Sequence, residues 1–130
     1  MDDLIFTGNG RVICEEFKHS MQLEFDMTYL GKIGHILGIE LIQNEADIFI
    51  CQRRYVREIL VRFNMLNSNP VRNPMVPGTI LSKDDAGIPV DTTKFKQAIG
   101  SLMYLTITRP DLMFGVSLIS RYMANPKKSH

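Results

Sequence analysis

Apolar and polar positions alternate in ways that divide the first third of the chain into short elements. Leu4 to Thr7 is an apolar run that predicts a strand, closed by a turn at Gly8-Asn9-Gly10. From Arg11 to Phe25, apolar residues recur at every fourth position, which predicts an amphipathic helix with its apolar stripe in a core. The stripe consists of Ile13, Phe17, Met21 and Phe25.

A period of two replaces this helical period over residues 33–43, and it predicts one continuous strand. The polar residues 44–47 then separate it from the apolar run Ile48 to Cys51, so the two segments are expected to form a β-hairpin with a four-residue loop. Gly34 and Gly38 are expected to let another backbone come close.

Helical spacing returns in the second half of the chain. Gln52 to Met65 is predicted to be an amphipathic helix, and the proline-rich segment Asn67 to Pro89 is predicted to be a connector without regular structure. A helix capped at Asp91 is expected to run to about Ile107. The next helix, from Asp111 to Met123, follows so closely that the two are expected to form an antiparallel or steeply crossed pair. The predicted fold class is therefore α+β.

The helix predicted after the hairpin carries basic side chains outside its apolar face. They are Arg53, Arg54, Arg57 and Arg62. Such a cluster can contact the phosphates of a nucleic-acid backbone. The alternative is an ordinary solvated face that keeps the helix soluble. Arg109 is expected to tie the corner before Pro110 together rather than to bind phosphate.

The composition limits the class of protein. With 130 residues, 45% hydrophobic and 22% charged, the chain fits one modest folded domain. Its net charge of +1 excludes a strong global attraction to nucleic acid or membrane, so any such surface must be local. Cys14 and Cys51 lack metal-ligand spacing and suit reduced thiols. No signal peptide or membrane-spanning run is visible, so we expect an intracellular protein, cytoplasmic or nuclear, that does not contact a membrane.

The two adjacent carboxylates Asp2 and Asp3 are the strongest candidates for chemistry. They precede an apolar, strand-like run, and Mg²⁺ prefers carboxylate oxygens together with substrate phosphates. The alternative is a solvated chain end or a helix cap. No histidine is spaced with other ligands as a zinc site requires, and no nucleophile elbow or phosphate-binding glycine loop occurs.

Several ordered motifs resemble the reverse transcriptase of copia-type LTR retrotransposons, over essentially the whole chain. Met1-Asp2-Asp3-Leu4 is similar to the family's aromatic-x-Asp-Asp core, although the aromatic residue is missing. The sequence around Leu37-Gly38-Ile39-Glu40 is similar to the late palm hairpin of that family. The longest matches lie further on, in Ile99 to Leu105, Thr108 to Asp111 and Ser120 to Met123, closing with Pro126 and His130.

The resemblance implies part of a polymerase that joins DNA nucleotides with two Mg²⁺ ions as cofactors. Asp2 would be a metal ligand and Asp3 its supporting carboxylate. Residues 1–52 would be the C-terminal part of the palm and 53–66 the basic helix. A connector over 67–90 would then lead to a helical thumb-like region over 91–130. The partners would be an RNA/DNA primer-template and dNTP.

The resemblance further implies that the fingers and the rest of the palm would precede Met1, and that an RNase H domain would follow His130. The missing palm part would carry another metal-binding acid, so the chain alone is expected to be inactive, with Leu4 to Thr7 left as an unpaired sheet edge. Two alternatives remain open. In the first alternative the chain would be a residual module that binds primer-template phosphates. In the second it would be a structural subunit that completes a split polymerase.

Overall fold

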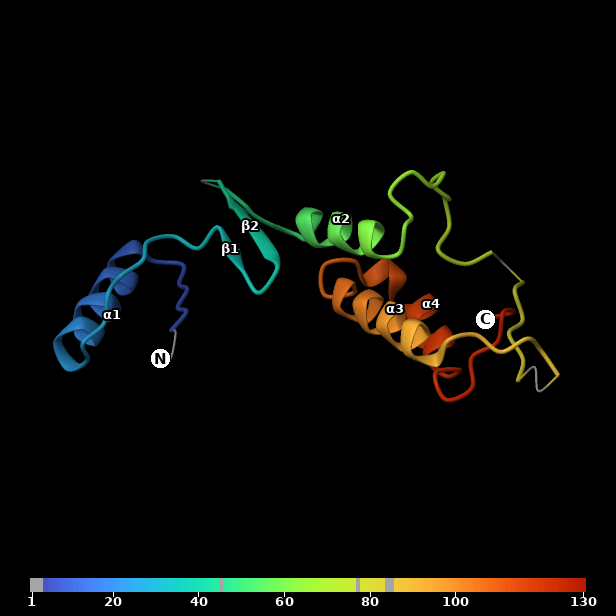
Figure 1. Cartoon of the computed structure of the whole chain (residues 1–130). Coiled ribbons are helices and arrows are strands. Elements are labelled where there is room, and N and C mark those ends of the chain that lie inside the picture. The colour runs from blue at the N-terminus through green and yellow to red at the C-terminus, as the bar shows by residue number, and fades with distance from the viewer. Residues whose placement is uncertain (1–3, 45, 77, 84–85) are drawn as a thin grey trace. The chain divides into compact units, whose positions relative to one another are not determined.

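The computed structural model describes residues 4–44, 46–76, 78–83 and 86–130. The chain divides into two compact units, residues 1–33 and residues 34–130. Helices and a small antiparallel sheet occur together, which confirms the predicted α+β class (Figure 1). None of the helices in these ranges is long and apolar enough to cross a bilayer.

The described residues of the first unit, 4–33, contain one helix, α1 (Arg11–Glu24), as the four-residue period predicted. The ring of Phe6 lies 5.1 Å from the ring of Phe17, measured between centroids, so the segment before the helix packs against its apolar stripe. Residues 4–7 form no strand, and the prediction of a strand and sheet edge there is wrong. A strand needs a hydrogen-bonded neighbour, and no described residue pairs with this segment.

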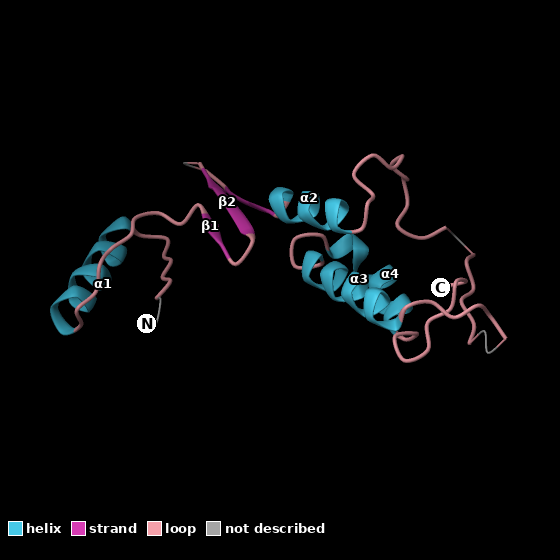
Figure 2. Cartoon of the chain, viewed as in Figure 1, coloured by secondary structure: helices cyan, strands magenta, loops and turns pink. Residues whose placement is uncertain are grey.

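The second unit begins with a sheet in the order β1-β2-β3, whose strands are β1 (His35–Ile36), β2 (Ile39–Gln43) and β3 (Ile48–Cys51). Both neighbouring pairs are antiparallel, and Figure 2 shows β1 and β2 as arrows. The predicted hairpin is confirmed, with Leu41 opposite Ile50.

The single strand predicted over residues 33–43 is wrong, because the chain turns at Leu37-Gly38. Both residues have positive φ angles, 49° and 79°, as in the tight two-residue turns that match the twist of a hairpin. Among the described residues, no backbone atom lies within 4 Å of a Cβ built on Gly34 or Gly38, so a side chain at either position would not collide with a neighbouring backbone. The nearest atom to such a Cβ on Gly38 belongs to the Tyr104 ring, at 3.8 Å.

The helical elements of the second unit follow the sheet: α2 (Arg53–Arg62), α3 (Thr92–Leu105), a 3₁₀ turn η1 (Pro110–Leu112) and α4 (Met113–Ser120). The predicted cap of α3 is confirmed, since the Asp91 carboxylate accepts hydrogen bonds from the backbone N–H groups of Thr93 and Lys94, at 2.9 and 3.1 Å. The helix predicted from Asp111 to Met123 is shorter than expected and begins with the 3₁₀ turn.

The core lies between these helices. Its buried apolar side chains are Ile59 of α2, Ile99 and Leu105 of α3, and Val116 of α4. The predicted packing of the last two helices is confirmed, because α4 lies against α3. The described part of the connector between α2 and α3 contains no helix or strand, as predicted, apart from an isolated β-bridge between Pro89 and Lys127.

Candidate nucleic-acid interface

The two acidic residues of the predicted metal site, Asp2 and Asp3, lie outside the described residues. Among the residues that are described, no three histidine, cysteine or acidic side chains come together in a group able to hold a metal ion. The role of the acidic pair therefore stays a prediction.

The four predicted phosphate-binding arginines all lie on α2 or its last turn and are exposed. A helix advances about 100° per residue, so Arg53, Arg54 and Arg57 share one side, while Arg62 lies further round. Arg54 forms an ion pair with Glu58 at 3.3 Å. Within the described ranges the other three arginines form no ion pair, and the Arg53 guanidinium lies 6.0 Å from the centroid of the Phe49 ring.

The opposite side of α2 is fixed to α3 by buried polar contacts. Gln52, the residue before α2, is only 2% exposed. Its amide oxygen accepts a hydrogen bond from the Thr108 hydroxyl at 2.7 Å, and its amide nitrogen donates to the Tyr104 carbonyl at 3.5 Å. One turn later, the Tyr55 hydroxyl donates to the Ser101 carbonyl at 3.3 Å. These contacts hold the arginine side of α2 toward solvent.

The sheet is tied to the same helices. The Glu40 carboxylate of β2 accepts a hydrogen bond from the backbone N–H of Arg54, at 2.9 Å, and so satisfies one free donor at the start of α2. The Tyr104 hydroxyl donates to the carbonyl of Leu37 in the tight turn. Spacing did not reveal these roles, because Glu40 and Tyr104 meet their partners only in the tertiary fold. For the buried contacts of α2, the one signal in the sequence is the position of Gln52 directly before the helix.

The corner between α3 and α4 is closed by Arg109 and Asp111. The guanidinium donates to both carboxylate oxygens, at 2.9 and 2.7 Å. This hydrogen bonding lowers the pKa of Asp111 below its ordinary value of 3.8, and it raises the pKa of Arg109. The prediction that Arg109 ties this corner together is confirmed.

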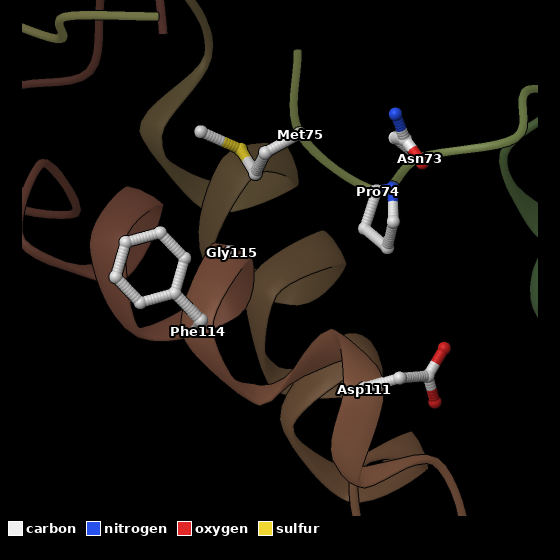
Figure 3. Close-up of a pocket in the computed structure, with 6 residues that line it drawn as sticks. All are labelled: Asn73, Pro74, Met75, Asp111, Phe114 and Gly115. Atoms are coloured by element: carbon white, nitrogen blue, oxygen red, sulfur yellow. The ribbon is translucent and has the colours of Figure 1, made fainter. Parts of the chain in front are cut away.

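A shallow pocket of about 350 Å³ lies where the connector crosses α4. Its lining residues are Asn73, Pro74, Met75, Asp111, Phe114 and Gly115 (Figure 3). A Cβ on Gly115 would lie 3.0 Å from the Met75 side chain, so the missing side chain is what lets the connector approach α4. The Phe114 ring is 73% exposed at the rim.

The other end of the connector is held by the C-terminal residues, which we call the tail clasp (Tyr122 and residues 126–130). The Tyr122 hydroxyl donates to the Leu81 carbonyl at 2.8 Å, and the ring stacks on His130 with 3.9 Å between centroids. His130 Nδ1 accepts the Lys127 N–H at 3.0 Å, so Nε2 carries the proton shared with the Ser82 carbonyl. Lys128 N–H donates to the Ile88 carbonyl at 2.8 Å.

Comparison with known proteins identifies the family. The model of the reverse transcriptase (RNA-dependent DNA polymerase) family matches residues 1–77, more than half of the chain. This chain belongs to the reverse transcriptase family. The retrovirus-related Pol polyproteins from transposons RE1 and RE2 of Arabidopsis thaliana are 32% and 33% identical to it over all 130 of its residues. A Pol polyprotein from transposon TNT 1-94 of Nicotiana tabacum is 32% identical over 139 aligned positions.

This reverse transcriptase chain spans only 9% of the RE1 and RE2 polyproteins. The match of the family model confirms the family resemblance read from the ordered motifs. The chain is similar to one segment of these retrotransposon Pol polyproteins. No solved structure matches it significantly.

Proposed function

We propose that this chain is the C-terminal palm and thumb-like part of the RNA-directed DNA polymerase of a copia-type retrotransposon. The observation that carries the proposal is the family match, which begins at the acidic pair and continues through the sheet and α2. The helical unit after the connector would then be the thumb-like region, with domain limits at residues 52, 66 and 90 as the resemblance implies.

Asp2 and Asp3 would hold Mg²⁺, because carboxylate oxygens are the donors that this ion prefers. Mg²⁺ held there would supply electrostatic stabilisation for the nucleotidyl transfer of the intact enzyme. A two-metal site draws its acids from separate elements, whereas the described residues supply no further acidic cluster. The polymerase reaction would therefore need the longer Pol polypeptide, with primer-template and dNTP as its partners.

Primer extension tests this assignment. The chain alone, with Mg²⁺ or Mn²⁺ and a defined RNA template, is expected to give no template-dependent product above an Asp2→Asn control. A longer Pol polypeptide containing the chain is expected to extend the primer and to lose at least about a hundredfold in rate on Asp2→Asn, since electrostatic stabilisation supplies much of the rate. Extension by the longer protein that survives both Asp2→Asn and Asp3→Asn would contradict the metal assignment.

A second candidate function is binding of primer-template phosphates by α2. It is favoured by the exposed arginines of α2, of which only Arg54 has an ion-pair partner among the described residues. The Gln52 and Tyr55 contacts fix the other side of the helix to α3. Each phosphate contact releases counterions, so affinity must fall with salt. The chain would then act as a binding module, or as a structural subunit that completes a split polymerase.

Fluorescence anisotropy with an RNA–DNA hybrid separates this function from a merely solvated helix face. Replacing Arg53, Arg54 and Arg57 by Ala is expected to make the slope of log affinity against log salt shallower by about 2 to 3, because each phosphate contact contributes about 0.9. The matched control removes the same charge elsewhere, with Arg11, Lys94 and Lys96 changed to Ala. Equal losses from both triple variants would show that only net charge matters.

A further inference from the structure

The free edge of β3 offers a surface that the polymerase assignment does not use. β3 is the last strand in the order β1-β2-β3, so within the described ranges it pairs with β2 alone. Its apolar side chains are exposed on both faces, with Ile48 at 59%, Phe49 at 53% and Ile50 at 51%. No charged residue lies in the strand to prevent another strand from pairing there.

The register shows which backbone groups point outward. Leu41 donates its N–H to the Gly34 carbonyl at 2.9 Å, so its backbone groups face away from β3. Leu41 is opposite Ile50, and that pair is therefore not hydrogen-bonded. Because hydrogen-bonded and non-hydrogen-bonded pairs alternate, Ile48 and Ile50 present their N–H and C=O groups to the free edge, while Phe49 is bonded to β2.

We propose that a second copy of this chain pairs its own β3 with this edge, antiparallel, around a two-fold axis through Phe49. Such an axis sets Ile48 opposite Ile50 of the second copy, and Ile50 opposite Ile48 of the second copy, as hydrogen-bonded pairs. The two Phe49 residues form a non-hydrogen-bonded pair, in which side chains come closest. The result is a continuous six-stranded antiparallel sheet built from the observed order of three strands in each copy.

The charges that flank β3 favour a second copy in this orientation. An acidic residue, Asp47, precedes the strand, and a basic residue, Arg53, follows it. The Arg53 guanidinium lies over the Phe49 ring, 6.0 Å from its centroid, and strand alternation puts Asp47 on the Phe49 face as well. Antiparallel pairing therefore brings the acidic start of each strand beside the basic end of the other, whereas parallel pairing would align like charges.

Sedimentation velocity and hydrogen exchange test the proposal on the chain itself. The fraction of dimer is expected to increase with protein concentration, and the amides of Ile48 and Ile50 are expected to become protected from exchange as it does. The Phe49 amide, which is bonded to β2, is expected to be protected at every concentration. Ile50→Pro removes an outward N–H without breaking a bond to β2, so it should abolish the dimer. Ile80→Pro is the matched control, since Ile80 is 91% exposed in the connector, and it should leave the dimer intact.

A charge exchange keeps the test decisive even if Ile50→Pro does not fold. In this register Cys51 of the second copy lies opposite Asp47 and Arg53 is its diagonal neighbour, within reach because its side chain is long. Asp47→Arg and Arg53→Asp should each weaken the dimer about two- to thirtyfold, because the two-fold axis generates this diagonal charge pair twice. The double exchange should restore it. The proposal would be overturned if the chain stayed monomeric at every concentration. It would also be overturned if the variant with both charges exchanged dimerised as weakly as the single variants. Protection of Ile48 and Ile50 by a different protein alone would overturn it as well.

Discussion

Helices α1 and α3 have the same length, fourteen residues, but very different surroundings. None of the residues of α1 is buried, and Ile13 on its predicted core stripe is 62% exposed. In α3, which contacts both α2 and α4, Ile99, Ser101 and Leu105 are buried. Both helices were predicted from the same kind of apolar spacing. Apolar spacing identifies the face of a helix that can be buried, whereas burial itself depends on a partner element.

The largest difference is expected between two isoleucine truncations. Ile99→Ala should lower the free energy of unfolding by about 2–5 kcal/mol, because Ile99 is 2% exposed and its removal leaves a cavity. Ile13→Ala in α1 should lower it by less than about 0.5 kcal/mol. Urea denaturation followed by circular dichroism measures both values. Equal losses would mean that the stripe of α1 is packed as tightly as the core of α3.

A polar pair sharpens the same comparison. Gln52→Met should cost about 1–3 kcal/mol, because it removes the buried acceptor of the Thr108 hydroxyl and one donor to the Tyr104 carbonyl, which still accepts from the Ile107 N–H. The matched control is Gln22→Met on an exposed position of α1, which should change stability by less than about 0.5 kcal/mol. In a double-mutant cycle, Thr108→Val should cost much less once Gln52 is replaced. Additive losses would contradict the coupling.

Much of this fold follows from local patterns, and the exceptions have physical causes. Asp91 was readable as a helix cap because its carboxylate bonds its own next residues. The turn at Leu37-Gly38 was not readable, since alternation continued through it and Leu37 is not a residue that favours a positive φ. The contacts of Gln52 and Glu40 join residues far apart in sequence, and no spacing announces them.

Two helical glycines should respond oppositely to alanine. A Cβ added to Gly100 in α3 would meet no atom within 4 Å beyond its own helix, so Gly100→Ala should raise stability by about 0.5–1 kcal/mol through helix propensity. Gly115→Ala in α4 should instead lower stability, because the new methyl group would lie 3.0 Å from the Met75 side chain and crowd it. Thermal denaturation compares them. A gain at Gly115 equal to that at Gly100 would show that Met75 simply moves aside.

The smallest effect concerns the exposed corner of α3 and α4. The Arg109 hydrogen bonds keep the pKa of Asp111 below 3.8, so their contribution is complete above the ordinary pKa and is lost as pH falls through the lowered value. An NMR titration should show Asp111 titrating below 3.8, and Arg109→Gln should raise its midpoint toward that value. An unchanged midpoint in Arg109→Gln would assign the lowered pKa to another cause.

The fastened connector has a consequence for how the chain can be divided. Met75 rests on Gly115, and the tail clasp holds Leu81 and Ser82, whereas residues 64–73 are exposed. Cleavage there would leave α2 joined to α3 through Gln52 and Tyr55. Two separately expressed fragments that are divided within this stretch should therefore bind each other and restore the contacts between α2 and α3.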